Sequence, residues 1–213
     1  MNSSQMKPSK EKKSHMKPIL LTLFSCLSLI RFTSLAHSAT LENVTFPEAI
    51  NCKGKSLILN GMGLRTKKIV LIKVKVYAAA LYLESKTNQR EQVLTDGKLK
   101  KIDLHFLHDV SKEKLVDAWK EAYEKNCDSS LMNCSQVPQL LEKMGAAVSE
   151  VKTGDHLQLT FLPSDILIQT KNSPEVLITG GSDFSKIALS AWFGKHPPNE
   201  ELQEGLLGKL SSQ

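Results

Sequence analysis

The chain has 213 residues, of which 41% are hydrophobic, so it is long enough for one ordinary globular domain with its own core. Its formal net charge is +6, but residues 1–38 carry six Lys or Arg and one acidic residue, which account for +5 of that charge. The rest of the chain is nearly neutral and lacks the basic excess that nucleic-acid binding requires. We therefore expect no nucleic-acid partner.

The first forty residues have the layout of a secretory signal peptide. Lysines precede a short apolar run, Ile19–Ile30, and small residues follow at Ala36–Ala39. The run is shorter than the about 20 residues that a membrane-spanning helix needs. We therefore predict a signal peptide at 1–38 and one domain at 40–213. The protein is then periplasmic or secreted, with no stable membrane anchor once the leader is removed.

Three cysteines lie beyond this leader. Cys127 and Cys134 are close in sequence, whereas Cys52 is remote. An oxidising compartment allows a disulfide between the close pair. Two separate thiols fit the sequence equally, because spacing does not show whether the side chains face each other. No C-x-x-C spacing favours a redox or zinc site, and His105 and His108 fall on opposite faces of a predicted strand, so we expect no metal site.

The first half of the predicted domain has the patterns of β-strands. Alternation and β-branched residues predict strands at Ser56–Leu64 and Ile69–Leu83, with a break at Arg65–Lys68 between them. Gly61-Met62-Gly63 also interrupts the pattern, and a third strand is predicted at Lys101–Leu107. In the second strand, one face is predicted to carry Lys73 and Lys75 and the other Val74, Val76 and Ala78.

The second half combines helices with short strands. After Ser111, a suitable N-cap, apolar residues including Trp119 recur at helical spacing. Three more helices are predicted, from Pro138 to Gly154 at the latest, between Asp183 and Gly194, and after Pro198, with strands at Leu157–Leu162, Ile166–Thr170 and Glu175–Thr179. Strands followed by helices and then by hairpins predict an α+β fold with a mainly antiparallel sheet.

One set of motifs resembles a known family. The run Gly61-Met62-Gly63-Leu64-Arg65, the strand ending in Leu81-Tyr82-Leu83-Glu84, Asn126-Cys127 and Phe193-Gly194-Lys195-His196 are together similar to the chalcone isomerase-like family, over essentially the whole chain after the leader. The resemblance implies an open-faced β-sandwich, with a large antiparallel sheet, helices packed on one face and an apolar cleft between them. It also implies chemistry without a cofactor.

The resemblance implies a binding role for Arg65 but does not favour chalcone cyclisation. In the plant enzymes an arginine on the early strand steers the substrate phenolate, and by motif position it corresponds to Arg65, whose planar guanidinium suits an oxyanion. At three positions where the plant enzymes carry a hydroxyl side chain, this sequence departs from their pattern. It has Tyr77, Trp119 and Ala191 there, with Ser190 next to Ala191. Indole donates from a different place than a phenol and accepts nothing. Catalytic residues stay unassigned, with Arg65 and Tyr77 as candidates.

Plastid members of the same family that bind fatty acids imply a different function. There an arginine and a tyrosine on the early strands hold the ligand carboxylate, and Arg65 and Tyr77 fit that pairing. The implied ligand-binding residues are Arg65, Tyr77, Trp119 and Asn126, and the implied ligand is an apolar anion such as a fatty acid, with haem as another candidate. We therefore predict a non-catalytic binding protein. An isomerase or lyase for an unsaturated carbonyl compound and a helper that binds a partner protein are the alternatives.

Without the resemblance, the same residues have ordinary structural explanations. A single arginine on a strand is usually a solvated or ion-paired surface residue, and a tyrosine such as Tyr77 is commonly a core aromatic with its hydroxyl at the edge. Trp119 at helical spacing favours core packing, and Asn126 suits a helix end. The structure must therefore decide which of these side chains reach a common cavity.

Overall fold

The computed structural model describes residues 37–171 and 173–210. The predicted signal peptide lies almost wholly outside the described residues. Among the described residues, no helix is long and apolar enough to cross a membrane.

A seven-stranded antiparallel sheet forms the centre of the fold, and each strand pairs with its neighbour in the chain. Its strands are β3 (Ala49–Cys52), β4 (Lys55–Ile69), β5 (Ile72–Leu83), β6 (Lys100–Phe106), β7 (His156–Phe161), β8 (Asp165–Thr170) and β9 (Val176–Thr179). A separate hairpin consists of β1 (Ser38–Leu41) and β2 (Val44–Pro47). The prediction of a mainly antiparallel α+β fold is confirmed.

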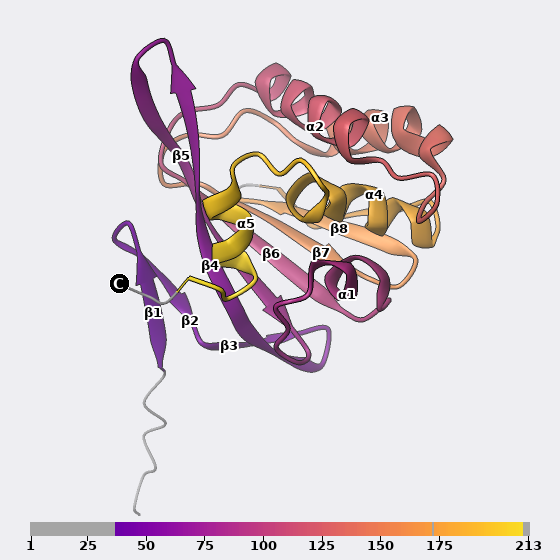
Figure 1. The fold of residues 1–213 in the computed structure, drawn as a ribbon, viewed down its shortest axis with the longest axis horizontal. Coiled ribbons are helices and arrows are strands. Elements are labelled where there is room, and N and C mark those ends of the chain that lie inside the picture. The colour runs from indigo at the N-terminus through magenta and orange to yellow at the C-terminus, as the bar shows by residue number, and fades with distance from the viewer. Residues whose placement is uncertain (1–36, 172, 211–213) are drawn as a thin grey trace, which may run out of the picture. The chain divides into compact units, whose positions relative to one another are not determined.

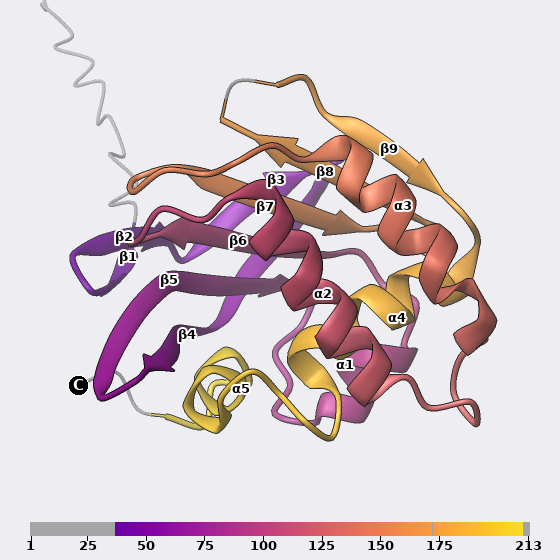
Figure 2. The same cartoon turned by 90° about the horizontal axis from the view of Figure 1, so that it is seen from above.

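Helices cover one face of the sheet (Figures 1 and 2). They are α1 (Arg90–Thr95), α2 (Lys112–Asn126), α3 (Val137–Ala147), α4 (Ser182–Phe193) and α5 (Glu200–Leu206), with a short 3-10 turn at Cys134–Gln136. As predicted, Ser111 caps α2, where its side chain accepts a hydrogen bond from the backbone N–H of Lys114. The short α1 and the strands β1 to β3 were not predicted.

The two faces of the sheet have separate cores. On the helix side, alternate residues of β6 such as Ile102, Leu104 and Phe106 pack against α2 and α4. On the opposite face, a smaller cluster joins Phe46 of β2 to Tyr82 of β5. Strand alternation therefore sends each set of side chains to one core, as expected for a sheet that is covered on both sides.

Gly61 and Gly63 lie inside β4 rather than interrupting it. A Cβ atom on Gly61 would lie 2.1 Å from the backbone oxygen of Gly205, and one on Gly63 would lie 2.4 Å from that of Leu202. The backbone of α5 therefore packs directly against that of β4. The predicted interruption was wrong because glycine within a strand can also mark the close approach of another backbone.

The predicted break at Arg65–Lys68 is also wrong. β4 continues to Ile69, and the chain turns back at residues 70–71 before β5 begins. The long β4–β5 hairpin extends away from the rest of the sheet in Figure 1. A run of lysines on a strand does not end it, because lysine side chains extend into solvent and leave the backbone free to pair.

The registers of β4 and β5 shift next to Arg65, which pairs with Tyr77, and Val76 is the extra residue of a β-bulge. An extra residue reverses the alternation of side chains along β5. Val76 therefore lies on the helix side together with Tyr77, while Ala78 packs in the core of the opposite face. The expectation that Val76 and Ala78 share a face was wrong for this reason.

Of the two arrangements that the sequence allowed for the close cysteines, the structure has the disulfide. Cys127, the C-cap of α2, is bonded to Cys134 at the start of the 3-10 turn. Cys52 is a buried free cysteine on the opposite face of the sheet. The disulfide holds the segment between α2 and α3 at the end of α2.

Candidate ligand-binding site

A cavity of about 680 Å³ lies between the sheet and the helices. Its floor is formed by side chains of β4, β5 and β6, and its roof by α2 and α4. The apolar wall includes Val76, Leu104, Phe106, Leu115, Ala118, Ala122 and Trp192. A volume of this size and a largely apolar wall are typical of small-molecule sites in proteins.

Arg65 lies on β4 in the cavity wall, next to the bulge of β5, and is half-buried. Its Nη1 donates to the backbone oxygen of Pro198 at 2.8 Å, to that of Thr66, and to Oδ1 of Asn199 at 3.3 Å. All of these acceptors are neutral, and they all use one nitrogen of the guanidinium. Within the described residues, Nε and Nη2 have no acceptor, so the three N–H donors on these two nitrogens remain for a ligand.

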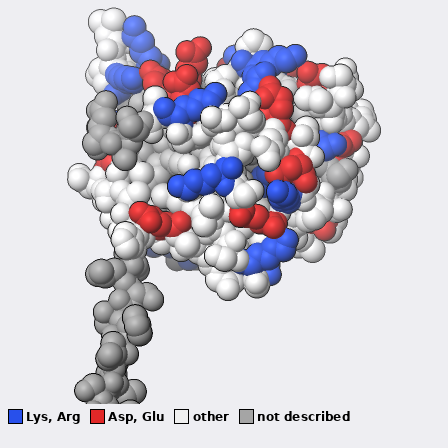
Figure 3. Space-filling view, turned by 60° about the horizontal axis from the view of Figure 1, so that its bottom comes forward, with Lys and Arg blue, Asp and Glu red and all other residues white. Residues whose placement is uncertain are grey.

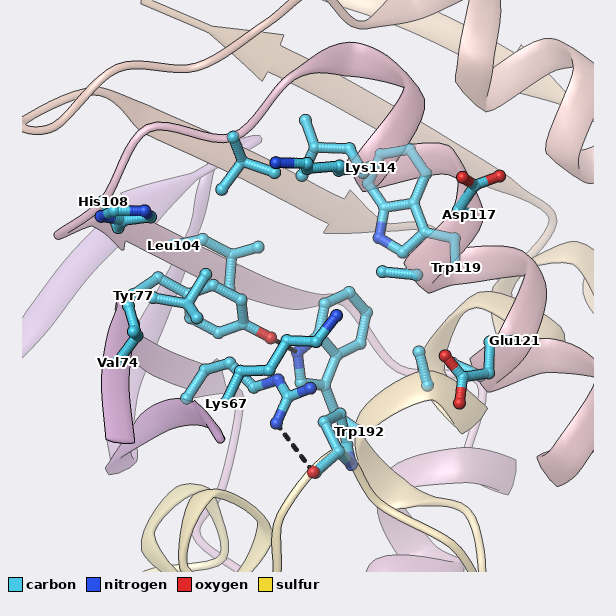
Figure 4. Close-up of a pocket in the computed structure, with 18 of the residues that line it drawn as sticks. Lys67, Val74, Tyr77, Leu104, His108, Lys114, Asp117, Trp119, Glu121 and Trp192 are labelled. Carbon is cyan, nitrogen blue, oxygen red and sulfur yellow. Dashed lines mark hydrogen bonds between the residues drawn. The ribbon is translucent and has the colours of Figure 1, made fainter. Parts of the chain in front are cut away.

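Tyr77 stands directly across from Arg65 on β5, and its ring also lines the cavity. Its hydroxyl oxygen accepts a hydrogen bond from the indole N–H of Trp192 at 3.1 Å (Figure 4). Because the oxygen acts as acceptor, its own O–H is free to donate to another molecule. Burial raises the pKa of Tyr77, and the charge of Arg65 and the Trp192 hydrogen bond offset this only in part. The hydroxyl is therefore a proton donor in hydrogen bonds and stays un-ionised at neutral pH.

Trp119 projects from α2 toward the cavity, across from Tyr77 (Figure 4). It is also a buried member of the helix-side core, so the same side chain packs in the core and lines the cavity. On α4, Ala191 lines the cavity, whereas the hydroxyl of neighbouring Ser190 is buried and donates to the backbone oxygen of Ile187 at 2.6 Å. Tyr77 thus carries the only hydroxyl among the described residues that line the cavity.

Asn126 ends α2 and is not part of the described cavity wall. Its amide nitrogen donates to the backbone oxygen of His196 at 2.8 Å, and its oxygen accepts from the backbone N–H of His196 at 2.6 Å. This pair of bonds fixes the loop that also carries Pro198, an acceptor of Arg65. The structure therefore gives Asn126 a positioning role behind Arg65, in place of the predicted ligand contact.

Asn199 is a site residue that the sequence did not indicate. Its Oδ1 accepts from the backbone N–H of Thr66 and from Arg65, both at 3.3 Å, and its amide donates to the backbone oxygen of Leu64 at 3.0 Å. The side chain thus satisfies backbone groups of β4 on either side of Arg65 and orients the arginine. A signal was present, since Asn after two prolines is a typical N-cap before a helix, but its partner strand is remote in sequence.

The rim of the cavity is charged. Lys67 extends over it from β4, and Lys114, Asp117 and Glu121 line it on the α2 side, with His108 on the loop after β6 (Figure 4). Glu121 pairs with Lys125 at 2.7 Å, and both side chains are more than half exposed. An apolar interior with a mixed-charge rim can hold an apolar chain inside while its polar head stays near Arg65.

A second polar cluster lies on the opposite face of the sheet, away from the cavity. His156 is 3.0 Å from the carboxylate of Asp103 through Nδ1 and 2.8 Å from Nδ1 of His105 through Nε2. The hydrogen bond to Asp103 raises the pKa of His156, whereas burial and the neighbouring histidine lower the pKa of His105. No group of three or more His, Cys, Asp or Glu in the described part of the chain is placed to hold a metal ion.

A fatty-acid binding protein of Arabidopsis thaliana has a similar structure, with a TM-score of 0.65 and 15% sequence identity over 80% of this chain and 96% of that one. At this identity the likeness concerns the fold. No curated protein matches significantly. The family described as chalcone isomerase-like matches residues 38–208, which is most of the sequence, and the chain therefore belongs to the chalcone isomerase-like family.

Proposed function

We propose that this protein binds a fatty acid or a similar apolar anion in the cavity between sheet and helices, without catalysing a reaction. The observation that carries the proposal is the pairing of Arg65 and Tyr77. Both side chains line one apolar cavity, and both have hydrogen-bond donors that no described residue uses. The solved fatty-acid binding protein with the same fold supports the choice of ligand class.

A carboxylate satisfies both donors at once. It accepts a charge-assisted bond from the guanidinium of Arg65 and a further bond from the hydroxyl of Tyr77, and such bonds are stronger than those between neutral groups. Trp192 orients the Tyr77 hydroxyl, while Asn199 and Pro198 orient Arg65. The donors are thus held in place before the ligand arrives, which reduces the entropy lost on binding.

The apolar part of the ligand fits the remaining wall. Alanines at positions 118, 122 and 191 leave room between the helices and the aromatic floor, and no charged side chain lies on the β6 part of the wall, which consists of Leu104 and Phe106. Burying an alkyl chain there contributes about 0.8 kcal/mol for each methylene removed from water. A polar anion without such a chain would gain only the interaction with the head group.

Catalysis of an isomerase or lyase type is less well supported. Such a reaction needs one group to stabilise an oxyanion and another to move a proton. Arg65 suits the first task, but the raised pKa of Tyr77 makes this phenol a poor base at neutral pH. α4 supplies no hydroxyl that could move the proton instead, because Ala191 lines the cavity and the Ser190 hydroxyl is bonded within its own helix.

We further propose that the protein works in the periplasm or outside the cell. The amino-terminal sequence suggests export. The Cys127–Cys134 disulfide is consistent with an oxidising compartment, where such bonds persist.

The direct test is to purify the protein from its native host and identify any small molecule that comes with it by mass spectrometry, together with an absorption spectrum for haem.

A fluorescent fatty acid is then titrated into wild type and Ala122→Phe, which fills the cavity, with the exposed Ala146→Phe as the matched control. We expect saturable binding that only Ala122→Phe weakens, by about tenfold or more. Binding that is insensitive to Ala122→Phe would show that the fatty acid sits elsewhere.

A further inference from the structure

The tip of the β4–β5 hairpin is apolar and exposed. It consists of Ile69, Val70, Leu71 and Ile72, with exposed fractions of 50%, 86%, 86% and 69%. These are four of the seven large apolar side chains that are exposed in the described part of the chain, and they are consecutive. An exposed apolar cluster of this kind marks an interaction site more often than a solvated surface.

Lysines flank the tip on both strands. Lys67 and Lys68 precede it, Lys73 and Lys75 follow it, and the sequence from residue 66 to residue 75 has no acidic residue. All four lysines are exposed, and of these four only Lys75 has an ion pair within the described residues, with Glu42. The hairpin lies at the upper left of Figure 1, and Figure 3 shows Lys or Arg side chains at its upper left.

The turn at the tip is made of residues that do not favour it. Ile69 pairs with Ile72, so Val70 and Leu71 form a two-residue turn, and Val70 has a φ of 56°. Positive φ at this first turn position is normally supplied by glycine, and a β-branched residue there is an outlier. Hairpin stability alone would not select valine. Its presence indicates that an apolar side chain at the tip serves another purpose.

The hairpin is also continuous with the cavity. Lys67, Ile69 and Val74 from the hairpin belong to the cavity wall, together with Arg65 at its base. A surface that contacts the tip therefore lies at the rim of the cavity. A ligand that leaves the cavity along these side chains meets that surface first.

We propose that the β4–β5 hairpin docks the protein on an anionic lipid bilayer, with Val70 and Leu71 inserted among the lipids and the four lysines at the level of the headgroups. An apolar tip with a basic border is the composition that binds such interfaces. A second copy of the chain fits less well, because pairing two tips brings eight lysines together without an acidic residue in either hairpin. The proposal concerns a surface outside the Arg65–Tyr77 pair and goes beyond the proposed fatty-acid binding.

Co-sedimentation with vesicles tests this surface. The full mature protein is mixed with vesicles of phosphatidylcholine alone and of phosphatidylcholine with about a third phosphatidylglycerol, at low and high salt. We expect binding to the anionic vesicles that high salt weakens. The tip variant Val70→Gly with Leu71→Ser, which suits the turn but lacks the apolar side chains, should bind roughly tenfold more weakly or worse. Lys73→Gln with Lys75→Gln, outside the cavity wall, should also bind roughly tenfold more weakly.

Two controls make the test specific. Leu177→Ser removes another exposed leucine, 52% accessible and distant in sequence, and should bind vesicles like wild type. Fatty-acid affinity should be unchanged in the tip variant, so the two functions can fail separately. Equal vesicle binding by wild type and tip variant, or no binding by wild type, overturns the proposal. So does a wild-type dimer in sedimentation analysis that the tip variant lacks, because it would assign the tip to a second copy.

Discussion

Replacement of Arg65 by alanine separates a binding role from a structural one. In the folded protein, Arg65→Ala removes hydrogen bonds from one nitrogen to Thr66, Pro198 and Asn199. Each such bond contributes about 0.5–1.5 kcal/mol, and the freed oxygens border a cavity that water can enter, so unfolding should become easier by only about 1–2 kcal/mol. Binding should suffer more, because the carboxylate loses its charged partner at a cost of about 2–5 kcal/mol, or some thirtyfold or more in affinity.

The assay is a titration of a fluorescent fatty acid into wild type and variants, with thermal melts of the same samples. Arg65→Lys should restore part of the affinity, because a single ammonium cannot reproduce the bidentate guanidinium. Tyr77→Phe should weaken binding by about 1 kcal/mol, since it removes one hydrogen bond and keeps the ring. Arg90→Ala, which removes an arginine of α1 that pairs with Glu91, is the matched control and should bind normally.

The fatty-acid affinity and the thermal melt together distinguish a binding role of Arg65 from a structural one. If Arg65→Ala binds the fatty acid as tightly as wild type, the anion site at Arg65 is refuted. If Arg65→Ala loses its cooperative melt while Arg90→Ala keeps it, Arg65 is mainly structural. We expect a third pattern, in which Arg65→Ala loses affinity for the fatty acid while its melting temperature shifts only slightly.

Three further predictions concern packing, pH and chemistry. Gly205→Ala should destabilise the fold by about 1–3 kcal/mol in a denaturant titration, because its Cβ would lie 2.2 Å from a β4 carbonyl oxygen, whereas Gly145→Ala, with 3.4 Å to the nearest atom, should be nearly neutral. The pKa of His156 is raised in the folded state, so protonation of His156 stabilises the fold. This stabilisation is fully present at a pH below the pKa of the unfolded chain, and it is lost as the pH rises through the folded-state pKa. Asp103→Asn should lower the pKa of His156 measured by NMR and reduce this acid-side stabilisation; an unchanged pKa would contradict the assigned cause. Finally, the purified protein should not cyclise a 2′-hydroxychalcone at a rate near that of plant enzymes, because α2 and α4 present no hydroxyl to the cavity, and comparable turnover would disprove this.

Local patterns predicted most of the fold's elements, whereas the Arg65–Tyr77 pair was proposed from the resemblance to the family. The family resemblance implied that Arg65 and Tyr77 act together, and the register pairs them directly, although Arg65 was expected in a break between strands. The helices after Ser111 and around Trp192 have strong periodicity, and they form as predicted. Such elements depend on contacts that repeat along the chain, which is why the sequence alone was enough.

Contacts between distant segments were not predictable in the same way. Gly61 looked like a break because the approach of Gly205 is invisible in sequence. Asn126 was expected to touch a ligand, but its amide is used by the backbone of a loop that follows α4. Asn199 was missed because its acceptors and donors lie on β4. In each of these cases the deciding partner lies far away in the chain.

The most direct test of the proposed function compares two ligands that have the same alkyl chain length and differ in whether the head group is charged. A saturated fatty acid and the alcohol of the same chain length are titrated into wild type and Arg65→Ala by calorimetry at neutral pH. If the cavity holds the apolar chain and Arg65 holds the carboxylate, wild type should prefer the acid by about tenfold or more, and Arg65→Ala should lose that preference while still binding the alcohol. Equal affinity of wild type for acid and alcohol, or the same preference in Arg65→Ala, would contradict the proposed site.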